Sequence, residues 1–232
     1  NTMLVANSGS EDNVIIGHQA GYYCDQSDWN VFIGGYAGYK LGDTGGATGH
    51  NNGDSSYNIA IGYEAMGGGD DTVANNVAAA NVAIGHHTLG GSTRESDGTA
   101  LSGDQNTVVG TFAMEDATSA ANNVAIGHDA GKSITTGGSN VIIGSNSGIQ
   151  TTDVDKTVII GVDAGIGNMT SDADGTVAIG YAAGYYIDSG IGNTAVGHAA
   201  LAGENDGDRN TAVGYEALRY QTGNTGTVGN TA

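Results

Sequence analysis

The apolar residues of this chain gather in triplets that are followed by a glycine, as in Asn-Val-Ala-Ile-Gly at residues 123–127. Aligned on that glycine, the sequence contains eleven copies, spaced by 17, 28, 23, 25, 17, 17, 17, 19, 17 and 17 residues. Because 17 is both the smallest and the commonest spacing, the pattern indicates a 17-residue repeat with occasional insertions. Each triplet predicts one short strand. The aligned glycines are Gly17, Gly34, Gly62, Gly85, Gly110, Gly127, Gly144, Gly161, Gly180, Gly197 and Gly214.

A 17-residue unit is too short for a pair of helices and suits one coil of a β-solenoid, with about two short strands and two turns. The expected fold is all-β: a parallel β-solenoid, or β-roll, of about eleven to twelve 17-residue coils with loop insertions. We expect residues 1–12 to form an N-terminal lead-in or a degenerate coil, and residues 13–232 to form the solenoid. The insertions are concentrated in residues 39–105, and such loops are often the binding face of a solenoid. The last coil, aligned on Gly229, is incomplete.

The three residues of each triplet predict how the strand packs. The first and third residues, such as Val124 and Ile126, are Val, Ile or Thr in every copy, and we expect them to fill the inside of the coil. The residue between them, such as Ala125, is apolar in all eleven copies, so we expect a second buried face. Further copies of the chain around an axis would cover that face, which predicts a parallel homotrimer. A wider monomeric solenoid with its own internal cover is the alternative.

Other residue types recur at fixed places in the unit. Asn precedes the triplet in nine copies, which predicts a ladder of stacked side-chain amides. The fourth residue after the glycine is either Gly or a large aliphatic residue, and the copies with Gly carry a bulky residue slightly later, such as Tyr39. His18, His86, His128 and His198 directly follow the repeat glycine, where Tyr also occurs. We expect these histidines to be steps in a side-chain stack rather than metal ligands.

Composition and charge exclude several function classes. Six Lys and Arg stand against 25 Asp and Glu, and the formal net charge of −19 would repel a phosphate backbone, so we expect no nucleic-acid partner. The apolar runs are far shorter than the ~20 residues that span a bilayer, so we expect no membrane insertion. Cys24 is the only cysteine, which rules out an internal disulfide and a cysteine metal cluster.

The sequence offers few residues for chemistry. The string Gly-His-Asp-Ala-Gly-Lys-Ser at residues 127–133 resembles a phosphate-binding loop but has three residues between its glycines where that loop needs four. No Ser, His and acid form a recognisable nucleophile arrangement, so we expect no enzyme activity, no catalytic residue and no cofactor. Two acidic turns, residues 171–176 and 204–210, space oxygen ligands as hard cations prefer, although solvated Asp/Gly turns would look the same. The candidate calcium ligands are Asp172, Asp174, Asp206 and Asp208.

The repeat carries a family resemblance. The strings NVAIGHDAG, NTAVGHAAL and NTAVGYEAL resemble the N-x-[VA]-[IV]-G-x-x-A repeats of bacteriophage tail-fibre proteins and of trimeric autotransporter adhesin heads, over residues 13–232. The resemblance implies a parallel trimer of β-rolls without enzyme activity, which acts as a rigid spacer or an attachment surface outside the cell.

The resemblance also implies partners. A tail fibre or related virion appendage would contact other fibre or virion proteins and a host surface receptor or glycan. The long units with insertions are more similar to phage fibres than to adhesin heads. A bacterial adhesin head is therefore the alternative, and a glycan- or ice-binding monomeric solenoid is the third hypothesis.

Overall fold

The computed structural model forms two compact units, Asn1–Asn122 and Asn123–Ala232. The predicted lead-in, apart from residue 12, and much of the predicted insertions lie outside the described residues. None of the described residues belongs to a helix that is long and apolar enough to cross a membrane. The structure describes residues 12–22, 24, 27–41, 55–67, 77–90, 101–221 and 229–232.

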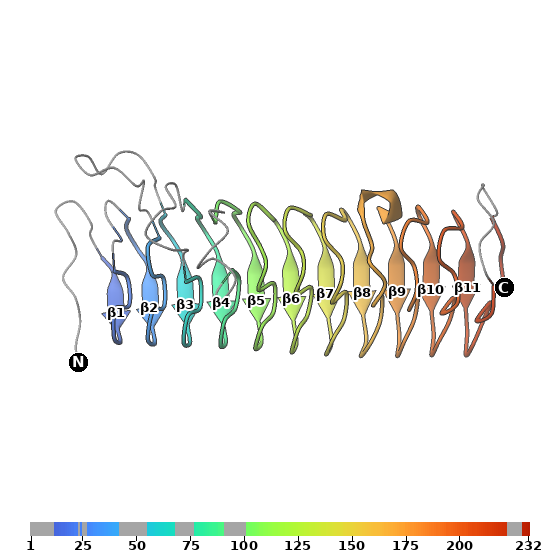
Figure 1. The fold of residues 1–232 in the computed structure, drawn as a ribbon, viewed down its shortest axis with the longest axis horizontal. Coiled ribbons are helices and arrows are strands. Elements are labelled where there is room, and N and C mark those ends of the chain that lie inside the picture. Colours follow the sequence, from blue (N-terminus) through green and yellow to red (C-terminus); the bar gives the residue numbers. More distant parts are fainter. Residues whose placement is uncertain are drawn as a thin grey trace. The chain divides into compact units, whose positions relative to one another are not determined.

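Each unit is a parallel β-solenoid in which one three-residue strand forms per repeat (Figure 1). The described residues contain no α-helix, and their only helical turn is the 3₁₀ turn η1 (Ser171–Ala173). The strands of the first unit are β1 (Val14–Ile16), β2 (Val31–Ile33), β3 (Ile59–Ile61), β4 (Val82–Ile84) and β5 (Thr107–Val109). The strands of the second unit are β6 (Val124–Ile126), β7 (Val141–Ile143), β8 (Val158–Ile160), β9 (Val177–Ile179), β10 (Thr194–Val196) and β11 (Thr211–Val213).

Within each unit, consecutive strands pair in parallel and without offset. Val141 pairs with Val158 and Ile143 with Ile160, so every triplet position forms a continuous row from coil to coil. This confirms the predicted all-β parallel solenoid and the alignment of its copies. Below, each coil is named after its strand.

The expected second strand of each coil is absent from the described residues, which form turns after the repeat glycine. The second and fourth residues after that glycine have positive φ, as in Asp129 (55°) and Gly131 (56°), and this backbone conformation ends a strand. The turns nevertheless stack by backbone hydrogen bonds. The N–H of Asn146 donates to the oxygen of His128, and that of Gly131 to the oxygen of Ser147, both at 2.9 Å.

The repeat glycine is required by close packing between coils. Gly127 has a φ of 140°, and a Cβ atom at that position would lie 2.4 Å from the carbonyl oxygen of Gly144 in the next coil. A side chain would therefore meet both backbone strain and a backbone clash.

The predicted inner and outer faces of the strand are reversed. The middle residue of the triplet, such as Ala125 or Ile142, is fully buried inside the coil. The first and third residues face outward, and Ile16 and Val213 are 57% and 59% exposed. The physical reason lies in the preceding Asn: Asn123 and Ala125 are two residues apart and share a face, and the buried Asn amide needs backbone partners inside the coil.

Strand and turn residues fill the interior of the coil together, so a small residue in the turn accompanies a large residue nearby. The predicted exchange of Gly with a large aliphatic residue is confirmed: Gly38 makes room for Phe32, whose ring a Cβ on Gly38 would approach to 2.7 Å. The later bulky residue that fills the core is the seventh after the repeat glycine, as in Leu41 and Ile134, which are fully buried. Among the residues predicted to fill the core, Ile134 is therefore confirmed, whereas Tyr39 is only half-buried.

The last described residues show that the predicted alignment of the final coil on Gly229 is wrong. Thr231 pairs with Thr211, and the N–H of Asn230 donates to Oδ1 of Asn210 at 3.2 Å. Asn230 therefore takes the ladder position of the next coil, and Gly229 is not a repeat glycine.

Candidate functional site

The outward face of the strands is an uncharged apolar surface, here called the outer strand face. It consists of the first and third residues of the strands β1 to β11, and all of them are Val, Ile or Thr. Several are clearly exposed, and most of the others are half-buried. Soluble monomers rarely expose a continuous apolar surface of this kind, which makes it a candidate interaction surface of each unit. Its exposed members are Val14, Ile16, Ile84, Thr107, Ile126 and Val213.

The Asn residues form the predicted ladder, although mostly through the main chain. Oδ1 of Asn123 accepts the backbone N–H of Asn140 at 3.0 Å, and Nδ2 of Asn140 donates to the oxygen of Val154 at 2.7 Å. Oδ1 of Asn140 accepts in turn from the N–H of Thr157 at 2.9 Å. Each buried amide thus joins consecutive coils, and its role is structural.

A second ladder, which the sequence analysis missed, uses the sixth residue before the repeat glycine. Oδ1 of Asp155 accepts the N–H of Gly138 at 2.6 Å, and Oδ1 of Asp174 accepts the N–H of Asp155 at 2.7 Å. Oδ1 of Asp208 accepts the N–H of Ile191 at 2.9 Å. The recurrence of Asp at this place in the aligned copies was the available signal.

The calcium candidates fall in these acidic turns without converging on one point. Asp174 and Asp208 belong to the second ladder, Asp172 lies exposed in η1, and Asp206 is half-buried. Among the described residues, no three His, Cys, Asp or Glu side chains come together in a group that could hold a metal ion. Calcium binding at these four residues stays a prediction.

The string at residues 127–133 is an ordinary part of a coil. The N–H groups of residues 130–133 donate to the carbonyl oxygens of Gly127, Ser147, Asp129 and Ile149, at 2.9–3.4 Å. A phosphate loop would present such N–H groups to its ligand. Here they already hold the turn together.

The residues after the repeat glycine form the predicted side-chain stack in parts of each unit. In the second unit, the rings of Tyr181, His198 and Tyr215 stack at centroid distances of 5.1 and 4.9 Å. In the first unit, Tyr63 stacks on His86 at 5.7 Å. Desolvation and the neighbouring His87 lower the pKa of His86, so this largely exposed ring favours its neutral form.

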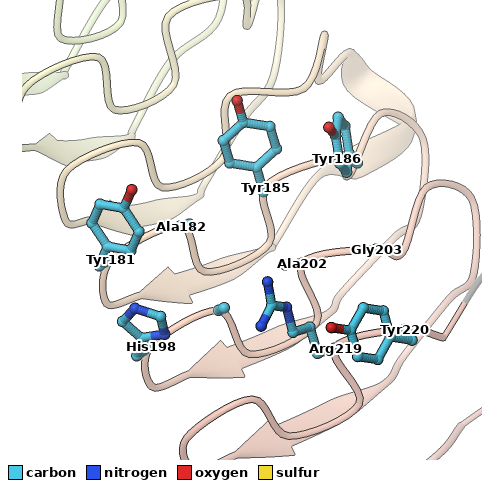
Figure 2. Close-up of a pocket in the computed structure, with 10 residues that line it drawn as sticks. Tyr181, Ala182, Tyr185, Tyr186, His198, Ala202, Gly203, Arg219 and Tyr220 are labelled. Carbon is cyan, nitrogen blue, oxygen red and sulfur yellow. The ribbon is translucent and has the colours of Figure 1, made fainter.

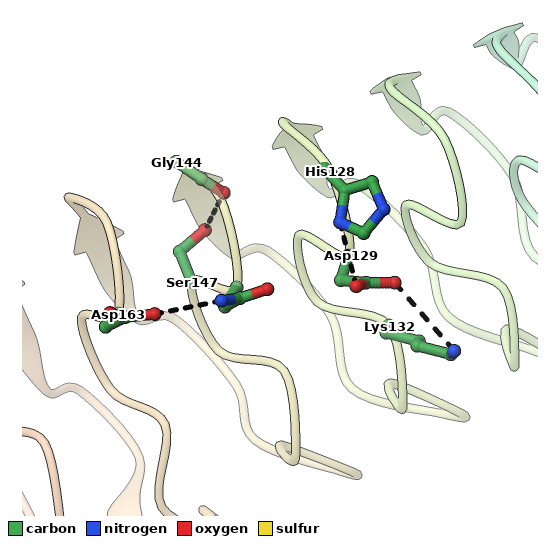
Figure 3. Close-up of polar contacts among 7 residues, drawn as sticks. His128, Asp129, Lys132, Gly144, Ser147 and Asp163 are labelled. Atoms are coloured by element: carbon green, nitrogen blue, oxygen red, sulfur yellow. Dashed lines mark hydrogen bonds and ion pairs between the residues drawn. The ribbon is translucent and has the colours of Figure 1, made fainter.

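The turns of the β6, β7 and β8 coils carry polar side chains instead (Figure 3). Nδ1 of His128 lies 2.8 Å from Oδ2 of Asp129, whose Oδ1 lies 3.8 Å from Nζ of Lys132. In the next two coils, Nδ2 of Asn146 donates to Oδ1 of Asp163 at 2.9 Å. His128 is thus a member of a polar cluster.

A groove of about 360 Å³ crosses the turns of the β9, β10 and β11 coils (Figure 2). The β10 coil contributes Ala202 and Gly203, whereas the same two positions carry two tyrosines in the β9 coil and Arg-Tyr in the β11 coil. The small residues of the middle coil therefore form the floor, and the large residues on either side form two walls. We call this the aromatic groove; its lining residues are Tyr181, Ala182, Tyr185, Tyr186, His198, Ala199, Ala202, Gly203, Arg219 and Tyr220.

This groove is not predicted by the sequence pattern. The predicted binding face is formed by the insertions concentrated in residues 39–105, of which residues 42–54, 68–76 and 91–100 lie outside the described residues. No protein-family model, curated protein or solved structure matches this chain.

Proposed function

We propose that this chain is a structural and adhesive segment of an extracellular trimeric fibre, of the kind found in phage tail fibres and related virion appendages that attach to a host. The outer strand face is the observation that carries the proposal. It is uncharged over all eleven strands of a chain whose net charge is −19, and it repeats once per coil. In this proposal the chain has no enzymatic role.

A second copy of the chain is the partner that fits this face best. A partner that covers every coil must present matching side chains at the strand spacing, about 4.8 Å. Parallel copies of the same chain supply that spacing, and they place Val and Ile rows opposite one another. The acidic turns would stay in solvent, where the negative charges of the copies are screened. The number three follows from the resemblance of the repeats to those of trimeric fibres.

The energy of association comes from many small gains. Completing the burial of one half-exposed Val or Ile contributes about 1 kcal/mol. The two rows hold nineteen Val and Ile residues in each chain, of which five are exposed and the others, already partly buried, contribute less. The loss of translational and rotational freedom on association costs about 4–15 kcal/mol, so burial along many coils is needed to offset it.

Two neighbouring residues provide the test. Ile126→Glu places a carboxylate on the outer strand face, and in a trimer three such charges would lie close together in an apolar interface. Sedimentation equilibrium should show a trimer for the native chain and a folded monomer for Ile126→Glu. Gln150→Glu adds the same charge at an exposed turn position and should remain trimeric.

Ala125→Glu completes the design. Its side chain lies inside the coil, so the charge should unfold the neighbouring coils, as a loss of the β signal in circular dichroism would show. A monomeric native chain, or an unchanged trimer of Ile126→Glu, would contradict the proposal.

A further inference from the structure

The aromatic groove has the shape and chemistry of a ligand site, and we propose that it binds one pyranose ring of a neutral saccharide. This inference extends the attachment role proposed above by naming a ligand class and a place. All residues of the groove come from one chain and from residues 181–220, within the second unit. The site is therefore complete without any partner copy.

The spacing of the coils sets the width of the groove. Its two walls belong to coils that are two strand spacings apart, which is about 9.6 Å between their backbones. That distance leaves room for one ring-shaped layer between the side chains of the walls. Figure 2 shows Tyr185 and Tyr186 on one side, Arg219 and Tyr220 on the other, and the backbone of Ala202 and Gly203 between them. A single six-membered ring matches this space better than an extended peptide or a flat protein surface.

The lining matches a ligand that is apolar on its faces and polar at its rim. Tyrosine rings are large, rigid and apolar on their faces and carry a hydroxyl at the edge. Tyr181, Tyr186 and Tyr220 are 52%, 58% and 81% exposed, so their surface is available to a ligand. A pyranose offers C–H groups on its faces and hydroxyls around its edge. The rings can pack against the former, while the tyrosine hydroxyls and the His198 imidazole can hydrogen-bond the latter.

The charges favour a neutral sugar over an acidic one. Arg219 is the only cationic side chain among the lining residues, and its guanidinium forms an ion pair with Glu216. It also lies over the ring of Tyr220, 5.1 Å from the centroid. Its charge is thus compensated within the chain, whose net charge of −19 repels anions. The remaining N–H donors of the guanidinium suit sugar hydroxyls.

The test uses the full chain and simple sugars as probes. Saturation-transfer NMR would be recorded with methyl α-glucopyranoside, methyl α-mannopyranoside, methyl β-galactopyranoside and N-acetylglucosamine, and with N-acetylneuraminic acid as the acidic probe. We expect transfer to the ring protons of at least one neutral sugar and a weaker signal from the acidic one.

Three variants locate the binding. Ala202→Tyr fills the floor with the side chain that the β9 coil carries at the same position, so the fold should tolerate it and sugar transfer should disappear. Tyr220→Ala removes one wall and should raise Kd about tenfold. Tyr63→Ala removes a comparably exposed tyrosine outside the groove and should leave Kd unchanged. Circular dichroism checks that each variant is folded.

The possible outcomes separate this inference from the fibre proposal. A trimer that binds none of the neutral sugars, or a folded Ala202→Tyr variant that binds as well as the native chain, would overturn the groove alone. Binding of the acidic probe only would overturn the neutral ligand class. A monomer that binds a neutral sugar through the groove would overturn the fibre proposal and leave the groove in place.

Discussion

The β6 to β8 coils and the β9 to β11 coils of the second unit share the left-handed backbone after the repeat glycine but carry different residues in these turns. In the first group, Asp129, Asn146 and Asp163 occupy the second position after the repeat glycine, with φ of 55–57°. In the second group, Ala182 and Ala199 adopt a φ of 51° at that position. Asp and Asn tolerate this left-handed conformation, whereas Ala does so at a cost of about 1 kcal/mol.

The two groups of turns differ in what their side chains contact. The polar turns use residues that suit their backbone and bond to neighbouring coils, as Asn146 does to Asp163. The aromatic turns accept two strained alanines, and those alanines line the groove between large side chains. The left-handed φ itself belongs to the repeat, since Tyr36 and Phe112 adopt it in the first unit, so the aromatic turns are distinguished by the groove that their residues line.

The largest expected effect tests whether the repeat glycines of the two groups pack equally closely against the next coil. Gly144→Ala and Gly197→Ala each place a Cβ 2.2–2.4 Å from a carbonyl oxygen of the next coil, at φ of 135–136°. Both should lose about 3 kcal/mol or more of unfolding free energy, measured by chemical denaturation. A variant that is far milder in one group than in the other would show that the coils do not pack alike.

A smaller effect tests the strain itself. Ala182→Asn should raise the unfolding free energy by about 0.5–1 kcal/mol, because Asn tolerates the left-handed backbone. The reverse change, Asn146→Ala, should lower it by about 1–2 kcal/mol, since it also removes the hydrogen bond to Asp163. If Ala182→Asn destabilised the chain, the backbone of the aromatic turns would not be under strain.

The repeat made much of the fold predictable, because the alignment of the glycines fixed both the strands and their register. The faces of the strand were not predictable from the triplets, since all three residues are apolar and carry no alternation. Only Asn123, two residues before Ala125, distinguishes inside from outside. The prediction of a second strand in each coil was wrong for a related reason. Positive φ at non-glycine residues such as Asp129 ends a strand but has only a weak signal in the sequence.

The aromatic groove was hidden because it depends on what one coil lacks. Ala202 and Gly203 are unremarkable by themselves and become a floor only between the large residues of the neighbouring coils. A comparison of the fifth and sixth residues after each repeat glycine contains this signal. The residues that all copies share do not carry this signal.

The smallest expected effect concerns the acidic turn at Asp174, at the border between the two groups of coils. Its Oδ1 accepts the N–H of Asp155 at 2.7 Å, so Asp174→Ala should lose about 1 kcal/mol of unfolding free energy. Asp174→Asn keeps a side-chain oxygen for this bond and should stay within about 0.5 kcal/mol of the native chain. Added calcium distinguishes a carboxylate that only accepts a hydrogen bond in the ladder from one that also binds a cation. If Asp174 serves the ladder alone, millimolar calcium should shift the thermal midpoint of the native chain and of Asp174→Asn equally, and no more than NaCl of the same ionic strength. A calcium-specific rise in the native chain that Asp174→Asn abolishes would instead make this turn a cation site, because binding to the folded state alone raises its stability.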